Sequence, residues 1–123
     1  MAELKKFKLD FNKTLLSLDG EVQQTIKSSV KAGSVITEDM FENLKANKLV
    51  ALAIANGSEE LAGKEFLWMK TLYIEGVLEL DIVDTRTLKN FIGECRKKAK
   101  QNFTNIVLMQ LNDIFDVAGF KEK

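Results

Sequence analysis

The sequence contains no histidine and no proline, and its single cysteine is Cys95. Without histidine, the chain lacks the residue that most often serves as a general acid or base and as a metal ligand. The absence of proline suits a helical chain and excludes a proline-rich linker. One cysteine cannot form an internal disulfide, which is compatible with a reducing compartment.

The chain also lacks an excess of charge of either sign, because 18 Lys and Arg residues balance 18 Asp and Glu residues. Proteins that bind nucleic acid or anionic membranes through general electrostatics usually carry a basic excess. No apolar run is long enough for a signal peptide at the N-terminus or for a membrane-spanning helix elsewhere. We therefore expect a cytoplasmic protein that does not associate with membranes.

Residues 1–36 are predicted to form a small β region. Residues 5–11 alternate between apolar and charged side chains, which is typical of a half-buried strand. A second apolar run at 14–18 is followed directly by Asp19 and Gly20, the usual signal for a type I′ hairpin turn, in which both residues have positive φ. The next strand is expected over 21–26, and the polar segment 27–34 is expected to be a mobile loop.

Residues 37–120 are predicted to be helical, within a single domain that covers residues 1–123. Thr37 is the expected N-cap of the first helix, and a short alternating segment at 77–82 separates the second helix from the third. The four helices are expected over 38–55, over 59–75, from Asp84 or Thr85 to a last turn that holds the basic cluster, and over 105–118. Gly76 is the expected stop of the second helix, and the fourth has Thr104 as its expected cap and Gly119 as its stop. Ala51 and Ala55 share a face of the first helix, and the third carries an apolar stripe of Leu88, Phe91, Ile92 and Cys95. The predicted fold class is α+β and mainly α, with an N-terminal β-hairpin followed by a compact four-helix domain.

The segment 61–95 contains the only Trp and the only Tyr of the chain, and its first helix is apolar around most of its circumference. A helix of this kind is normally central in a fold. The excess of apolar side chains also indicates a surface that another subunit or a partner protein covers. The residues of this candidate interface are Phe66, Leu67, Trp68, Met69, Tyr73 and Ile74. The alternative is that these side chains fill the core.

No motif in the sequence indicates catalysis. An EF-hand calcium loop that starts at Asp81 requires Gly at its sixth position and Glu at its twelfth, but these positions hold Arg86 and Ile92. We interpret Asp84 as a helix cap instead, and Cys95 as a buried thiol on the apolar stripe of its helix. No glycine-rich phosphate-binding motif is present. We therefore predict no catalytic residue, no cofactor site, no metal site and no enzymatic activity.

A basic cluster occupies the last turn of the third predicted helix and consists of Arg96, Lys97, Lys98 and Lys100. These side chains would be able to contact the phosphates of a nucleic acid. The alternative, which we favour, is a solvated helix end whose positive charge complements the helix dipole.

The segment 8–21, KLDFNKTLLSLDGE, resembles the opening of small tailed-phage and prophage proteins, which begin with an extended K-L-D…L-L-x-L-D-G-E stretch. The later segments ANKLVALAIA, YIEGVLELD, LKNFI and QLNDIF are similar to the same proteins. The resemblance implies a phage or prophage origin, a location in the host cytoplasm and an accessory, non-enzymatic role such as virion assembly. It supplies no functional residue.

The main hypothesis from the sequence is a non-enzymatic protein-interaction or assembly protein, which binds a protein partner or forms a homo-oligomer. The alternative is a nucleic-acid-associated helical module that uses the basic helix end.

Overall fold

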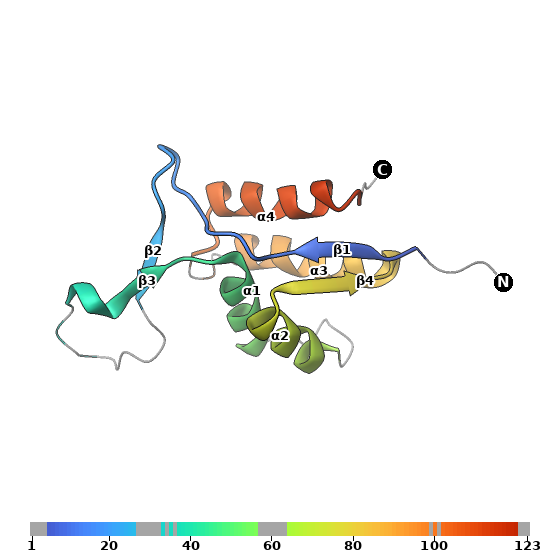
Figure 1. The fold of residues 1–123 in the computed structure, drawn as a ribbon, viewed down its shortest axis with the longest axis horizontal. Coiled ribbons are helices and arrows are strands. Elements are labelled where there is room, and N and C mark those ends of the chain that lie inside the picture. Colours follow the sequence, from blue (N-terminus) through green and yellow to red (C-terminus); the bar gives the residue numbers. More distant parts are fainter. Residues whose placement is uncertain are drawn as a thin grey trace.

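The computed structural model describes residues 5–26, 33, 35, 37–56, 64–98, 100 and 102–120. These residues form an N-terminal hairpin turn, four short strands, a 3-10 turn and four helices, so the predicted α+β class is confirmed (Figure 1). In chain order the elements are β1 (Phe7–Asp10), β2 (Gln24–Ile26), η1 (Glu38–Met40), β3 (Phe41–Asn43), α1 (Ala46–Ala55), α2 (Glu65–Ile74), β4 (Val77–Leu80), α3 (Ile82–Lys97) and α4 (Asn105–Val117). The loop predicted at 27–34 lies outside the described residues, apart from Gly33.

Strands β1 and β4 form an antiparallel ribbon at the centre of the molecule. Phe7 pairs with Leu80, and Leu9 pairs with Leu78. Because side chains alternate between the two faces of a strand, these four side chains share one face, and all four are buried. Figure 1 shows α4 on one side of this ribbon, α1 and α2 on the other, and α3 behind it. The predicted strand at 5–11 is confirmed over residues 7–10, and its partner β4 forms within the alternating segment predicted at 77–82.

The hairpin turn at Asp19 and Gly20 reverses the chain where it was predicted. The Ser17 N–H donates to the Glu21 carbonyl at 2.7 Å and closes a three-residue loop. Only Gly20 of the two turn residues has a positive φ, 87°, so the turn is not type I′. The Asp19 carboxylate instead accepts hydrogen bonds from the Ser17 hydroxyl and the Glu21 N–H, and both lower the pKa of Asp19.

The first predicted helix was wrong over its N-terminal half. Residues 38–40 form the 3-10 turn, and β3 pairs with β2 as a second antiparallel ribbon. Pairing with β2 satisfies backbone groups of β3 that a helix would have satisfied internally. Thr37 makes no side-chain cap hydrogen bond to this turn. The helical pattern of 38–55 is therefore overridden by a partner strand that lies earlier in the chain.

Helix α1 begins where the N-terminal segment supplies acceptors for its first N–H groups. The Ala46 N–H donates to the Lys13 carbonyl at 2.9 Å, and the Asn47 N–H donates to the Phe11 carbonyl at 3.0 Å. The first N–H groups of a helix have no partner inside the helix, so these carbonyls replace a side-chain cap. The start of α1 therefore depends on contacts between distant parts of the chain.

Helices α1 and α2 pack against each other as a helical hairpin (Figure 1). Trp68 and Leu72 are the buried residues of the described part of α2, and Asn47 of α1 donates from Nδ2 to the Leu72 carbonyl at 3.0 Å in the interior. The predicted helix over 59–75 is confirmed from residue 65 to residue 74, and residues 59–63 lie outside the described part. Gly76, with φ 76°, follows the end of α2 as predicted.

Helix α3 starts earlier than predicted, and its cap is Asp81 rather than Asp84. Asp81 Oδ1 accepts a hydrogen bond from the Asp84 N–H at 2.8 Å. Because β4 ends at Leu80, Asp81 is the first residue that can leave the strand and adopt the extended cap conformation. Asp84 itself lies in the first turn, where negative charge favours the helix dipole.

Helix α4 has both termini where they were predicted. Thr104 is the N-cap, and its hydroxyl accepts from the Val107 N–H at 3.4 Å. At the other end Gly119, with φ 87°, turns the chain, and the Phe120 N–H donates to the Phe115 carbonyl at 3.0 Å. This is the Schellman arrangement, which folds the residue after the glycine back onto its helix. Phe120 is accordingly buried.

The core joins the central ribbon to all four helices. Its largest fully buried side chains include Phe11, Phe115 and Phe120, whose rings meet edge to face with centroids 6.1 and 6.3 Å from Phe115. Cys95 is also buried, as predicted. One apolar core therefore holds the N-terminal strand, the end of α4 and the inner faces of α1 to α3 together.

Candidate functional site

The six residues of the predicted interface divide between the core and the surface of α2. Trp68 is 3% exposed and belongs to the core, so it is not part of an exposed face, and Met69 is partly buried against the core. The other four side chains remain open to solvent, with exposed fractions of 69% for Phe66, 66% for Leu67, 52% for Tyr73 and 68% for Ile74. We call these four residues the α2 apolar face.

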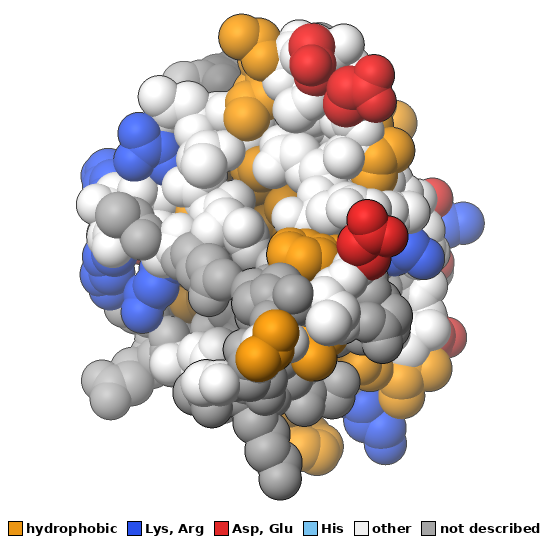
Figure 2. All heavy atoms as spheres, turned by 90° about the vertical axis from the view of Figure 1, so that its left-hand side faces the viewer, with side chains coloured by type: hydrophobic (Ala, Val, Ile, Leu, Met, Phe, Trp, Pro, Cys, Tyr) orange, Lys and Arg blue, Asp and Glu red, His pale blue; other side chains and the backbone are white. Residues whose placement is uncertain are grey.

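A shallow apolar groove lies between the α2 apolar face and α1. The α1 side consists of the small side chains Ala51 and Ala55 and of Leu52, which is 42% exposed. Phe66, Met69, Lys70, Tyr73 and Ile74 form the α2 side, and the hollow has a volume of about 280 Å³. In Figure 2 hydrophobic side chains reach the surface in the lower part of the view, at the level of α1 and α2 in Figure 1.

Two lysines mark this groove. Among the described residues that line it, Lys70 carries the only charge. Lys70 lies four residues after Phe66 and four before Ile74, so it occupies the middle of the exposed stripe of α2. Lys48 of α1 places its Nζ 5.8 Å from the ring centre of Tyr73, and its ion pair with Glu42 is long, at 3.9 Å. The described part of the groove is therefore apolar with positive charge in its middle and at one border.

The predicted basic cluster lies at the end of α3 and beyond it. Lys97, Lys98 and Lys100 are exposed, whereas Arg96 is half-buried and donates from Nε to Asn105 Oδ1 at 2.6 Å. Lys97 also pairs with Glu94 at 3.4 Å. On the face shown in Figure 2, one group of Lys and Arg side chains lies along the left edge, and others lie on the right and at the lower right near red carboxylates. The left edge of this face is therefore locally basic, and its right side carries charges of both signs.

A second hollow, of about 540 Å³, lies between the β2–β3 ribbon, α1 and the residues Lys100, Asn102 and Phe103. Of the described residues that line it, three are basic, Lys45, Lys48 and Lys100, and one is acidic, Glu42. Lys48 and Leu52 belong to this hollow, and Leu52 also lines the apolar groove. The two hollows therefore adjoin across α1, and positive charge predominates in the second.

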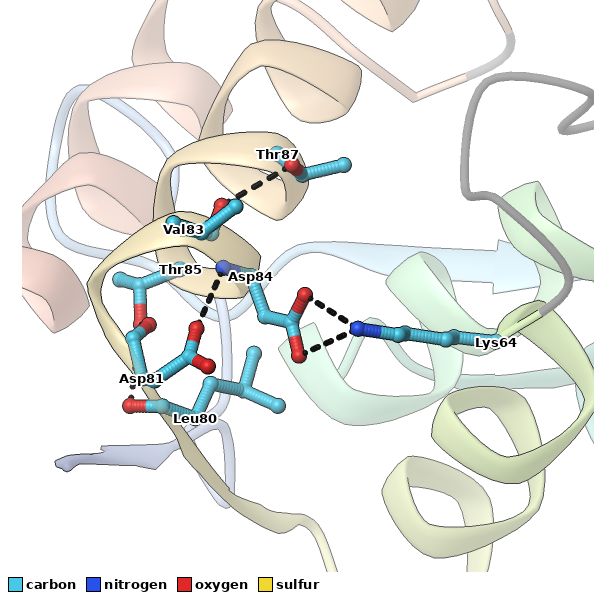
Figure 3. Close-up of polar contacts among 7 residues, drawn as sticks. All are labelled: Lys64, Leu80, Asp81, Val83, Asp84, Thr85 and Thr87. Atoms are coloured by element: carbon cyan, nitrogen blue, oxygen red, sulfur yellow. Dashed lines mark hydrogen bonds and ion pairs between the residues drawn. The ribbon is translucent and has the colours of Figure 1, made fainter. Parts of the chain in front are cut away.

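Helix α2 is anchored at its N-terminal end to α3. Lys64 Nζ lies 2.7 and 3.0 Å from the two carboxylate oxygens of Asp84, and Figure 3 shows the lysine extending toward the first turn of α3. The hydrogen bond to Asp84 raises the pKa of Lys64 above its ordinary value of 10.5. Together with the buried Trp68 and Leu72, this ion pair fixes the orientation of α2.

The ion pair predicts a pH dependence of stability. A lysine whose pKa is higher in the folded chain stabilises the fold fully below its unfolded pKa and loses this contribution as pH rises through its folded pKa. We expect the difference in unfolding free energy between the wild type and Lys64→Met to be constant from neutral pH to about pH 9 and to shrink above about pH 10.5. Urea denaturation across this range measures it. A difference that grows with pH would contradict the assigned pair.

The acidic residues at the start of α3, Asp81 and Asp84, have structural roles. Asp81 caps α3, Asp84 pairs with Lys64, and the Thr85 hydroxyl donates to the Asp81 carbonyl at 2.6 Å. Within the described residues, no group of three or more Cys, Asp or Glu side chains is placed to hold a metal ion. None of the described helices is long and apolar enough to cross a membrane.

Comparisons with known proteins found no match to this chain among family models, curated proteins or solved structures. The resemblance to small tailed-phage and prophage proteins therefore stays a prediction.

Pattern reasoning missed the α1 side of the groove and the lysines that mark it. The small residues Ala51 and Ala55 were assigned to one face of the first helix, with no indication that α2 would leave a hollow beside them. The signal for Lys70 was present, because Phe66, Lys70 and Ile74 are spaced by four residues and share one helical stripe. This spacing shows which side chains share a face of the helix, but it does not show whether that face is buried.

Proposed function

We propose that this chain is a non-enzymatic protein-interaction module, which docks a partner protein on the groove between α1 and α2. The observation that carries the proposal is the α2 apolar face, four large exposed side chains of which Phe66, Tyr73 and Ile74 line an apolar hollow. Soluble monomers rarely leave contiguous apolar patches of large size uncovered. Aromatic side chains in particular are enriched in protein interfaces, where they act as anchors.

The anchoring of α2 also supports a docking role. Trp68 and Leu72 hold the inner side of the helix in the core, and the Lys64–Asp84 pair holds its N-terminal end. The exposed side chains are thus presented by a fixed helix, which reduces the entropy that binding would otherwise cost. The resemblance to phage accessory proteins is in line with an assembly role.

A crosslinking experiment tests the proposal. Leu67 is replaced by the photoreactive residue benzoylphenylalanine in the cells that naturally produce the chain, and a second protein carries the same residue in place of Val117 on α4. Both positions are well exposed, at 66% and 81%. We expect a discrete covalent adduct with a protein from position 67 and none from position 117.

A surface variant provides the control for this adduct. Phe66→Ser together with Ile74→Ser removes two members of the α2 apolar face, so the adduct from position 67 is expected to disappear while the chain stays folded. Equal labelling from positions 67 and 117, or an adduct that survives the double substitution, would show that α2 is not the docking surface.

A second candidate function is nucleic-acid binding, which the exposed Lys97, Lys98 and Lys100 favour. Lys100 also lines the second hollow with Lys45 and Lys48, so the basic surface extends from the end of α3 toward α1. Lysines on one face attract the phosphate backbone without sequence preference and lose affinity as salt rises.

Electrophoretic mobility shift at low salt tests this candidate with labelled single-stranded and duplex DNA. A salt-sensitive shift that weakens when Lys97, Lys98 and Lys100 are changed to Ala would support it. No shift beyond that of an unrelated neutral protein, or a shift that the triple substitution leaves unchanged, would exclude it.

A further inference from the structure

We infer that the occupant of the groove is an amphipathic helix of another protein that carries acidic side chains beside its apolar stripe. This inference rests on the proposed docking function and adds the chemistry of the partner. It is carried by the shape of the groove, by the charge in and around it, and by the position of Lys70 within it.

The groove has the shape that a helix occupies. The α2 residues that line it run from Phe66 to Ile74, which spans about 12 Å at 1.5 Å per residue, and the α1 residues run from Ala51 to Ala55. A partner helix of about two turns spans this length and lays residues spaced by three and four positions along it. The small Ala51 and Ala55 leave the hollow open for large apolar side chains of the partner.

The charge around the groove selects the partner. Lys70 lies in the middle of the exposed stripe, and Lys48 lies over the Tyr73 ring at the border toward the second hollow. Beyond Lys48, the described lining of the second hollow adds Lys45 and Lys100, with one carboxylate from Glu42. Covering Lys70 with an apolar surface alone would bury an unpaired ammonium group, which is costly, whereas a carboxylate beside the apolar stripe pairs with it.

The same lysine disfavours a second copy of this chain as the occupant. In a two-fold symmetric dimer the same patch faces itself. Because Lys70 lies midway between Phe66 and Ile74, antiparallel docking of α2 on its own copy brings the two Lys70 side chains together. Like charges at the centre of an interface oppose association, so the partner has to supply the opposite sign.

Two synthetic helical peptides test the inference with the full chain. Both have about 16 residues, long enough for four turns, and the same leucine stripe, but one carries Glu and the other Lys at the positions that flank the stripe. Fluorescence anisotropy measures their binding to the wild type, to Lys70→Glu, and to Arg86→Glu as a control on the exposed side of α3. We expect the Glu peptide to bind the wild type at least about tenfold more tightly than the Lys peptide. Lys70→Glu is expected to abolish this preference, and Arg86→Glu to retain it.

The possible outcomes separate this inference from the proposed function. Equal binding of both peptides, or a preference that Lys70→Glu leaves intact, would overturn the acidic partner while the adduct from position 67 still supports docking. Binding of neither peptide, together with a stable dimer in sedimentation, would overturn it in favour of a second copy. Absence of an adduct from position 67 when Phe66 and Ile74 are unchanged is the result that removes the docking function itself.

Discussion

Phe115→Ala is expected to lower the free energy of unfolding by about 3–5 kcal/mol, the range for phenylalanine truncation in a well-packed core. Phe115 is fully buried, and its ring meets those of Phe11 and Phe120 edge to face. The three rings connect the N-terminal segment, α4 and the Schellman turn, so these elements have little freedom to close the cavity. Urea denaturation measures the loss.

Two variants accompany this measurement. Val117→Ala lies on the same helix but at a position that is 81% exposed, so it is expected to change stability by no more than about 0.5 kcal/mol. If Phe115→Ala does not fold, Phe115→Leu is measured instead. Leucine retains part of the side-chain volume, so this variant is expected to lose less unfolding free energy. A loss below about 1 kcal/mol for Phe115→Ala would show that the aromatic cluster is not the centre of the core.

Gly76→Ala is expected to lower the free energy of unfolding by about 2–3 kcal/mol, the sum of left-handed backbone strain and one lost hydrogen bond. Gly76 has φ 76°, and a Cβ added there would lie 2.5 Å from Cγ of Asn12. The Asn12 side chain would have to move, which breaks the hydrogen bond from its Nδ2 to the Glu75 carbonyl at 2.9 Å. The turn between α2 and β4 is therefore specified by glycine and by the N-terminal segment together.

Gly93→Ala is the matched control for this substitution. Gly93 lies within α3, where an added Cβ meets nothing within 4 Å, so the exchange is expected to stabilise the chain by about 1 kcal/mol through helix propensity. Adding Asn12→Ala to Gly76→Ala should change stability little further, because the hydrogen bond is already lost. Fully additive costs would show that Asn12 and residue 76 do not compete for the same space.

Sequence patterns correctly predicted those parts of the fold that are determined by residues close together in the chain. The alternation at 5–11, the spacing of Leu88, Phe91, Ile92 and Cys95 in α3, and the Thr104 cap with the Gly119 stop of α4 all depend on nearby residues. The structure agrees with each of them. The helix-forming pattern at 38–55 failed over its first half because β2 pairs with residues 41–43.

The candidate site was predicted only in part, for a related reason. A helix that is apolar on most sides carries no local signal for which side faces the core, so Trp68 and Phe66 were assigned to the same interface. Packing decides between them, with Trp68 buried and Phe66 exposed. The groove itself requires α1 and α2 to lie side by side, and that arrangement depends on distant contacts such as Asn47 to Leu72.

The central claim is that the α2 apolar face lies outside the core and is free to bind. The unfolding free energy of the double variant Phe66→Ser and Ile74→Ser, measured by urea denaturation, tests it most directly. The structure predicts a value within about 1 kcal/mol of the wild type, because both side chains are about two-thirds exposed. A loss of about 4 kcal/mol or more, as two core truncations would give, would show that this face packs against the chain itself and offers no docking surface.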